Sequence, residues 1–185
     1  MTMMDRLFNF SSWKIAGGLL GFNFILQALI LLVIYPMIST TTTPLDVQIG
    51  LTPDLITSYF NEIGEVGRKY YLLNEMTIDM LFPLVYSFAY ALLLVELIKS
   101  LKLTGSAVKY IALLPFGIGL SDIIENTLII TGLQIYPTQN STFESALIYA
   151  NMAKHGLTFV ALLSVCIFVI WLVFSKVSRR KTQSN

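Results

Sequence analysis

The sequence predicts an all-α fold: a polytopic four-helix transmembrane bundle with an amphipathic helix in the first extracytoplasmic loop. Of its 185 residues, 55% are hydrophobic and only 12% are charged, whereas an average soluble domain has about 25% charged residues. A chain with so few charges cannot cover a water-exposed surface. It also contains four apolar segments that are long enough to cross a bilayer, which takes about 20 residues in an α-helix.

The four spans are expected within a single membrane domain, residues 1–185, at about residues 15–35, 77–98, 110–133 and 150–174. Pro36 is expected to end the first span, because proline lacks the amide hydrogen that continues a helix. In the third span, Pro115, Gly117 and Gly119 are expected to bend or loosen the helix, as often occurs beside a binding site at membrane depth.

The long first loop contains the signals of a helix start. Thr52 supplies a hydroxyl for the N-cap and Pro53 suits the first helical position, so a helix is expected at about residues 53–63. Its apolar residues fall on one stripe: Leu55, Ile56, Tyr59, Phe60 and Ile63. Such an amphipathic helix lies on the membrane surface or caps the bundle. Gly64 and Gly67 are expected to break it.

The basic residues predict that both termini are cytoplasmic. With four spans, nine basic residues lie on the side of the termini: Arg6, Lys14, Lys99, Lys102, Lys109, Lys176, Arg179, Arg180 and Lys181. The other side has three, namely Arg68, Lys69 and Lys154. Because cytoplasmic loops carry the excess of lysine and arginine, we expect an integral, multi-pass protein whose long loop faces the outside or an organelle lumen.

The third span contains three polar residues, Asp122, Glu125 and Asn126, in an otherwise apolar run. A charged side chain at the centre of a membrane helix costs about 2.5–3.5 kcal/mol on insertion scales, so these residues need a reason to be there. Their spacing of i, i+3 and i+4 places them on one face of the helix. The pattern predicts a buried polar site inside the bundle.

The other spans also carry polar residues at the level of the outer half of the membrane, whereas their inner halves are almost wholly apolar. These residues are candidates for substrate binding: Asp79, Tyr86, Asn151, Lys154, His155 and Gln27. Ionisable groups inside a membrane usually mark a functional site. The alternative is a structural network in which Asp122 or Glu125 pairs with Lys154 and fixes the packing.

The outer half contains three carboxylates and one lysine, so its charges do not balance. Two neighbouring carboxylates in a site of low dielectric constant rarely both ionise, so one is expected to keep its proton. Asp122 and Glu125 are therefore candidate catalytic groups, a general acid and base that Asn126 would orient. A proton-coupled ion site would use the same residues.

Other kinds of site have little support in the sequence. The chain has one histidine and one cysteine, His155 and Cys166, whereas zinc and di-metal sites commonly use more of these ligands, so no metal site is expected. Nothing matches a phosphate-binding loop or a haem attachment motif, and no cofactor is expected. The net charge of +1 gives no electrostatic argument for nucleic acid.

One pattern resembles a family of small, uncharacterised integral membrane proteins with four spans. It covers about residues 60–160 and consists of Gly67-Arg68, Tyr71, Asp79, Pro83 and Tyr86, followed by Asp122-x-x-Glu125-Asn126 and Lys154. The resemblance implies the four-span fold and a shared polar cluster, and it implies no activity. The sterol-isomerase and sigma-2-receptor group is an analogy, because those small helical membrane proteins also bury acids in a lipid-accessible cavity.

Three classes of function fit these residues. The leading hypothesis is an acid/base site in the outer half that binds, and in an enzyme would transform, an amphiphilic, lipid-like molecule. The second is a proton- or cation-coupled transporter, which would be a homo-oligomer because four helices leave little room for a pore. The third is an accessory subunit without chemistry that docks on a membrane partner, for which Gly17 and Gly21 would allow close helix approach.

Overall fold

The computed structural model of the protein describes residues 2–103 and 105–183, and this part of the chain is helical and contains no strand. The predicted all-α class is confirmed. Four helical segments of the described residues are long and apolar enough to cross a membrane: Trp13–Ile38, Ile78–Ser100, Ala107–Ile135 and Ser141–Ser178. The chain is an integral, multi-pass membrane protein with buried acidic residues.

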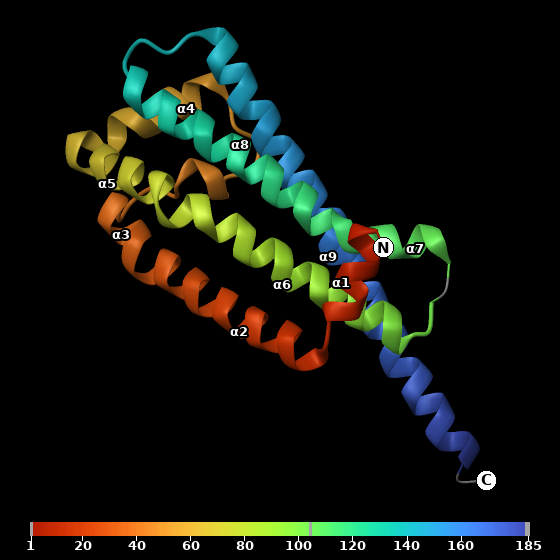
Figure 1. Ribbon diagram of the computed structural model, residues 1–185. Coiled ribbons are helices and arrows are strands. Elements are labelled where there is room, and N and C mark those ends of the chain that lie inside the picture. Colours follow the sequence, from red (N-terminus) through yellow and green to blue (C-terminus); the bar gives the residue numbers. More distant parts are fainter. Residues whose placement is uncertain (1, 104, 184–185) are drawn as a thin grey trace.

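The long helices of these segments are packed in sequence order (Figure 1). Helix α2 (Trp13–Leu29) packs on α6 (Ile78–Ser100), α6 packs on α8 (Leu114–Ile135), and α8 packs on α9 (Ser141–Gln183). Helix α9 also contacts α6, whereas it has at most a slight contact with α2. The packing therefore closes the bundle on every side except between α2 and α9.

The first span continues beyond the proline that was expected to end it. Helix α2 passes through a π-helical turn, η1 (Ile30–Ile34), into the short helix α3 (Tyr35–Ile38). Pro36 lies in the first turn of α3, directly after the π-helical turn, and an irregular turn of this kind accommodates a proline that would otherwise break the helix. The expectation that Pro36 ends the helix was therefore wrong.

The helix predicted in the first loop is present as α4 (Pro53–Glu62). The Thr52 hydroxyl accepts a hydrogen bond from the backbone amide of Leu55 at 3.2 Å, as expected of an N-cap. Ile56 and Phe60 on its apolar stripe are fully buried. Of the two placements that the sequence left open, α4 therefore caps the bundle, where it contacts α5 and α9.

A further helix, α5 (Gly64–Met76), follows α4 directly and was not expected from the sequence. Gly64 has a φ of +66° and forms the corner between the two helices, a conformation that glycine adopts at low cost. Gly67 lies inside α5, so the expectation that it breaks a helix was wrong. A Cβ atom at Gly67 would lie 2.5 Å from the backbone oxygen of Ile38, so glycine is needed here for close packing.

The third span begins with α7 (Ser106–Tyr110) and the 3-10 turn η3 (Ile111–Leu113), and α8 then runs without a break. Pro115 lies in the first turn of α8. A Cβ atom at Gly119 would collide with the Ser87 hydroxyl of α6. Gly119 thus brings α8 close to α6, and the Ser87 hydroxyl donates a hydrogen bond to the Pro115 carbonyl at 2.9 Å.

The opposite end of the bundle from α4 and α5 carries α1 (Met3–Phe10) and both termini (Figure 1). Here Lys99 pairs with Glu96, three residues earlier on α6, at 2.8 Å. The Ser11 hydroxyl also donates to Glu96 at 2.7 Å and ties the turn after α1 to α6. The side chains of the basic tail, Arg179, Arg180 and Lys181, lie outside the described part of the structure.

Candidate functional site

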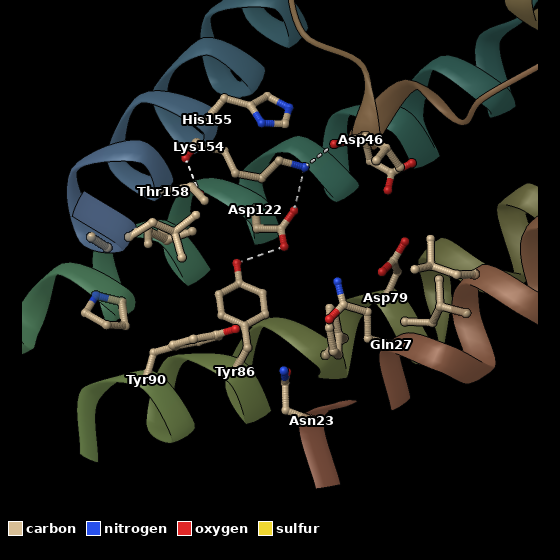
Figure 2. A pocket seen from close by; sticks show the side chains of 18 of the residues that line it. Asn23, Gln27, Asp46, Asp79, Tyr86, Tyr90, Asp122, Lys154, His155 and Thr158 are labelled. Carbon is tan, nitrogen blue, oxygen red and sulfur yellow. Dashed lines mark hydrogen bonds and ion pairs between the residues drawn. The ribbon is translucent and has the colours of Figure 1, made fainter. Parts of the chain in front are cut away.

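Polar side chains from all four long helices line one cavity of about 400 Å³ near the end that α4 and α5 cap (Figure 2). Of the predicted site residues, six line it: Gln27, Asp79, Tyr86, Asp122, Lys154 and His155. The other three, Glu125, Asn126 and Asn151, are buried behind its wall. The structure thus divides the predicted set into residues that a ligand can touch and residues that it cannot.

Lys154 holds two of the predicted acids together. Its ammonium group lies 3.1 Å from Asp122 Oδ1 and forms a closer ion pair with Glu125 Oε2. All three side chains are buried. A buried charge is tolerated only when it is paired and hydrogen-bonded, so this trio explains how two carboxylates are held inside the membrane helices.

Each carboxylate of the trio also accepts a hydrogen bond from a neutral side chain. The Tyr86 hydroxyl donates to Asp122 Oδ2 at 2.9 Å, and the Asn151 amide donates to Glu125 Oε1 at 2.7 Å. Asp122 faces the cavity, whereas Glu125 is 0% exposed and does not line it. Asp122 is therefore the member of the predicted acid/base pair that a molecule in the cavity could contact.

The side chain of Asn126 bonds to α6 rather than to the two acids beside it on α8. Its amide group donates to the backbone oxygen of Asp79 at 2.7 Å and contacts neither carboxylate that it was expected to orient. Helix geometry accounts for this difference. Adjacent residues point about 100° apart around a helix of 3.6 residues per turn, so Glu125 turns towards α9 while Asn126 turns towards α6.

Asp46 is a site residue that the sequence did not reveal. It lies in the short turn η2 (Leu45–Val47) of the first loop, and its backbone oxygen accepts a hydrogen bond from Lys154 at 2.6 Å. Its carboxylate accepts hydrogen bonds from Tyr35 at 2.5 Å and from Tyr71 at 2.9 Å. Burial raises the pKa of the Tyr71 phenol, and the nearby Asp46 charge raises it further, so Tyr71 stays a neutral donor.

Glu75 is the second acid that was missed. It lies on α5, is fully buried, and has one oxygen within 4.8 Å of the carboxylate oxygens of both Asp46 and Asp79. Asp79 in turn accepts a hydrogen bond from Asn74 at 2.9 Å. The spacing of four residues from Tyr71 to Glu75 was the signal in the sequence, since both residues share a face of α5.

The cavity is polar near the cap and apolar away from it. Towards the cap its wall is formed by acidic and basic groups, with His155 on α9 and Gln27 on α2 (Figure 2). The His155 Nε2 atom is buried and has no hydrogen-bond partner in the described chain. Further along the helices, the cavity is lined mainly by apolar residues: Leu94, Pro115, Ile118, Ala161, Leu162 and Val165.

Comparisons of this chain with protein-family models, with curated proteins and with solved structures give no match. The function of the site is therefore argued from its chemistry. The cavity wall offers carboxylates that accept hydrogen bonds or protons, with Asp122 and Asp79 among them. Lys154 already has three oxygen partners in the protein, so it has little capacity left to bind an anion.

Proposed function

We propose that this protein binds an amphiphilic, lipid-like molecule in the cavity between α2 and α9. The observation that carries the proposal is the change of lining along the cavity, from carboxylates near the cap to apolar side chains in the membrane. The apolar part of the molecule would lie against Leu94 and Leu162, and its polar head would lie near Asp79 and Asp122. A small-molecule site commonly combines an apolar wall with a few convergent polar groups.

The slight contact between α2 and α9 supports an entry route from the lipid. Both helices contribute residues to the cavity, Asn23 and Gln27 on α2 and Thr158 and Leu162 on α9. Gln27 and Leu162 are exposed on the surface that faces lipid in a membrane. A lipid-like molecule could therefore reach the cavity sideways, without crossing the aqueous phase.

The charges of the wall indicate the kind of head group. Acidic side chains outnumber basic ones there, because Asp46, Asp79 and Asp122 all line the cavity and Lys154 is engaged with protein oxygens. A head with hydroxyl or amine donors complements such a wall, whereas a phosphate head would be repelled. If the bound head is also transformed, Asp122 is the acid/base group that would touch it.

We also propose that the capped end faces away from the cytoplasm, as the distribution of basic residues predicts. Helix α1 and the last turns of α9 both lie at the end of the molecule away from α4 and α5 (Figure 1). Labelling of single cysteines introduced at exposed Glu62 on α4 and at Lys14 near the N-terminus, in sealed vesicles, would test this orientation. Glu62→Cys should react from outside with a membrane-impermeant reagent, and Lys14→Cys should not.

The binding proposal is tested by native mass spectrometry of protein purified in mild detergent without added lipid. We expect a co-purified amphiphile on the wild type and its loss from Ala161→Phe, because Ala161 is a buried residue of the apolar wall and the larger ring would fill the cavity. The matched control is Ala153→Phe, which makes the same change at an exposed position of α9 outside the cavity lining.

Equal retention of the adduct by Ala161→Phe and Ala153→Phe would contradict the proposal, and so would a wild-type protein without any adduct. Asp122→Asn tests the head group, since it removes the charge that faces the cavity while the amide keeps the shape of the side chain. We expect this variant to bind the amphiphile more weakly. It should still elute as a monodisperse species and show a cooperative thermal unfolding transition.

A further inference from the structure

Three acids meet below the cap, at a place that is separate from the Lys154 trio. Asp46 in the first loop, Glu75 at the end of α5 and Asp79 at the start of α6 are 8%, 0% and 6% exposed. Each contributes a carboxylate oxygen that lies within 4.8 Å of the oxygens of the other two. The chain folding therefore brings three acidic groups from three elements to one buried point.

The hydrogen bonds of this cluster leave one of its acids without a donor other than a neighbouring carboxyl group. Asp46 accepts from two tyrosine hydroxyls, and Asp79 accepts from the Asn74 amide at 2.9 Å. By contrast, both oxygens of Glu75 are buried and accept no hydrogen bond from any described residue. The side-chain oxygen of Asn74 is also buried without a donor. These buried oxygens can be satisfied either by a proton that Glu75 shares with Asp79 or by a bound cation.

No basic side chain in the described part of the chain neutralises the cluster. Lys154 is the closest candidate, but its ammonium contacts the backbone oxygen of Asp46, and its ion pairs are with Asp122 and Glu125. Three ionised carboxylates cannot stay buried together without compensation.

We propose that Asp46, Glu75 and Asp79 bind a hard divalent cation through oxygen atoms alone. Carboxylate and amide oxygens are ligands for Ca²⁺, Mg²⁺ and Mn²⁺, while Zn²⁺ favours histidine and cysteine, neither of which is in the cluster. At a Ca²⁺–oxygen distance of about 2.3–2.6 Å, two opposite ligands lie roughly 5 Å apart. Separations of at most 4.8 Å are therefore compatible with three oxygens that share one Ca²⁺ ion.

The bound cation would connect the cap to the membrane helices. Asp46 belongs to the loop that leads into α4, Glu75 belongs to α5, and Asp79 begins α6. Glu75 is the residue to substitute in a test of the cation site, because Asp46 and Asp79 also line the amphiphile cavity whereas Glu75 does not. The cation site goes beyond the proposed amphiphile binding and does not depend on it.

The test uses full-length protein in detergent, stripped with EDTA and then titrated with CaCl₂, MgCl₂ or MnCl₂ at constant ionic strength. We expect Ca²⁺ to raise the wild-type Tm saturably by about 5–10 °C, with one ion per chain measured by calorimetry. Glu75→Gln should weaken Ca²⁺ binding at least about 10-fold, because ligand sets lose that much even when only an orienting residue is removed.

Glu62→Gln is the matched control, since it makes the same substitution at an exposed position of α4. It should keep the full response to Ca²⁺. The proposal is overturned if no divalent cation raises the wild-type Tm, if all salts raise it equally, or if Glu75→Gln responds as the wild type does. A Tm of Glu75→Gln in EDTA that is at least that of the wild type shows that this variant folds.

The two proposals fail in different ways. Ala161→Phe fills the apolar part of the amphiphile cavity and changes none of the three acids of the cluster. We expect this variant to lose the co-purified amphiphile and keep the Ca²⁺ response. Glu75→Gln should show the reverse, a retained amphiphile and a lost Ca²⁺ response.

Discussion

The ammonium group of Lys154 on α9 donates a hydrogen bond to the backbone carbonyl of Asp46 in the first loop at 2.6 Å. This bond joins the cap to the membrane helices at the point where the cavity and the acidic cluster meet. The lysine also pairs with Asp122 and Glu125. One side chain thus connects the loop, α8 and α9, and its removal should affect all three.

We expect Lys154→Met to destabilise the protein by about 3–5 kcal/mol, because it leaves two buried carboxylates without their cation. The measurement is thermal unfolding in detergent. Lys69→Met is the control, since Lys69 pairs with Glu65 on the surface, with side chains 76% and 77% exposed, and exposed pairs contribute at most about 1 kcal/mol. Equal effects of the two variants would show that the buried trio is not important for stability.

Gly119→Ala should destabilise the protein by about 1–3 kcal/mol through overpacking. The new methyl group would collide with the Ser87 hydroxyl and press on the Pro83 carbonyl, 3.0 Å away. Gly117→Ala is the matched control two residues earlier, where a Cβ atom would meet only Leu157 Cδ1 at an ordinary 3.6 Å. A Gly119→Ala protein that unfolds at the temperature of Gly117→Ala would refute this account of the α6–α8 contact.

Much of the fold could be predicted because membrane helices leave a strong local signal. The apolar runs and the Thr52 cap both depend on residues close together in the sequence. Helix α5 was missed because glycine at 64 and 67 suggested a loop. Only the packing shows that Gly67 is needed for close contact with Ile38, and this contact is between residues far apart in the chain.

The candidate site was predicted in part for the same reason. The spacing of Asp122 and Glu125 placed both on the side of α8 that meets Lys154. Asp46 lies in a loop without helical periodicity, so no pattern could place it beside Tyr35 and Tyr71. Its role depends on how the loop folds back over the bundle, which is a tertiary property.

The last prediction concerns the pH dependence of stability in cation-free protein. Burial raises the pKa of Glu75 well above its ordinary value of 4.5, and the neighbouring acids Asp79, Asp46 and Asp122 raise it further. Below pH 4.5 this carboxyl is protonated in both the folded and the unfolded protein. As the pH rises above that value, the unfolded chain releases the proton while the folded chain keeps it, so the free energy of unfolding falls.

In EDTA, Glu75→Gln should therefore match the wild type near pH 4.5 and become progressively more stable than it as the pH rises towards 8. Each kcal/mol of difference corresponds to about 2–4 °C in Tm for a chain of this size. The facing phenols of Tyr59 and Tyr71 do not add to the slope, since burial raises the pKa of both and they stay neutral over this range. Glu62→Gln, at an exposed position, should follow the wild type at every pH. A Glu75→Gln protein that is less stable than the wild type at pH 8 in EDTA would mean that Glu75 is ionised and paired with a group other than a removable cation.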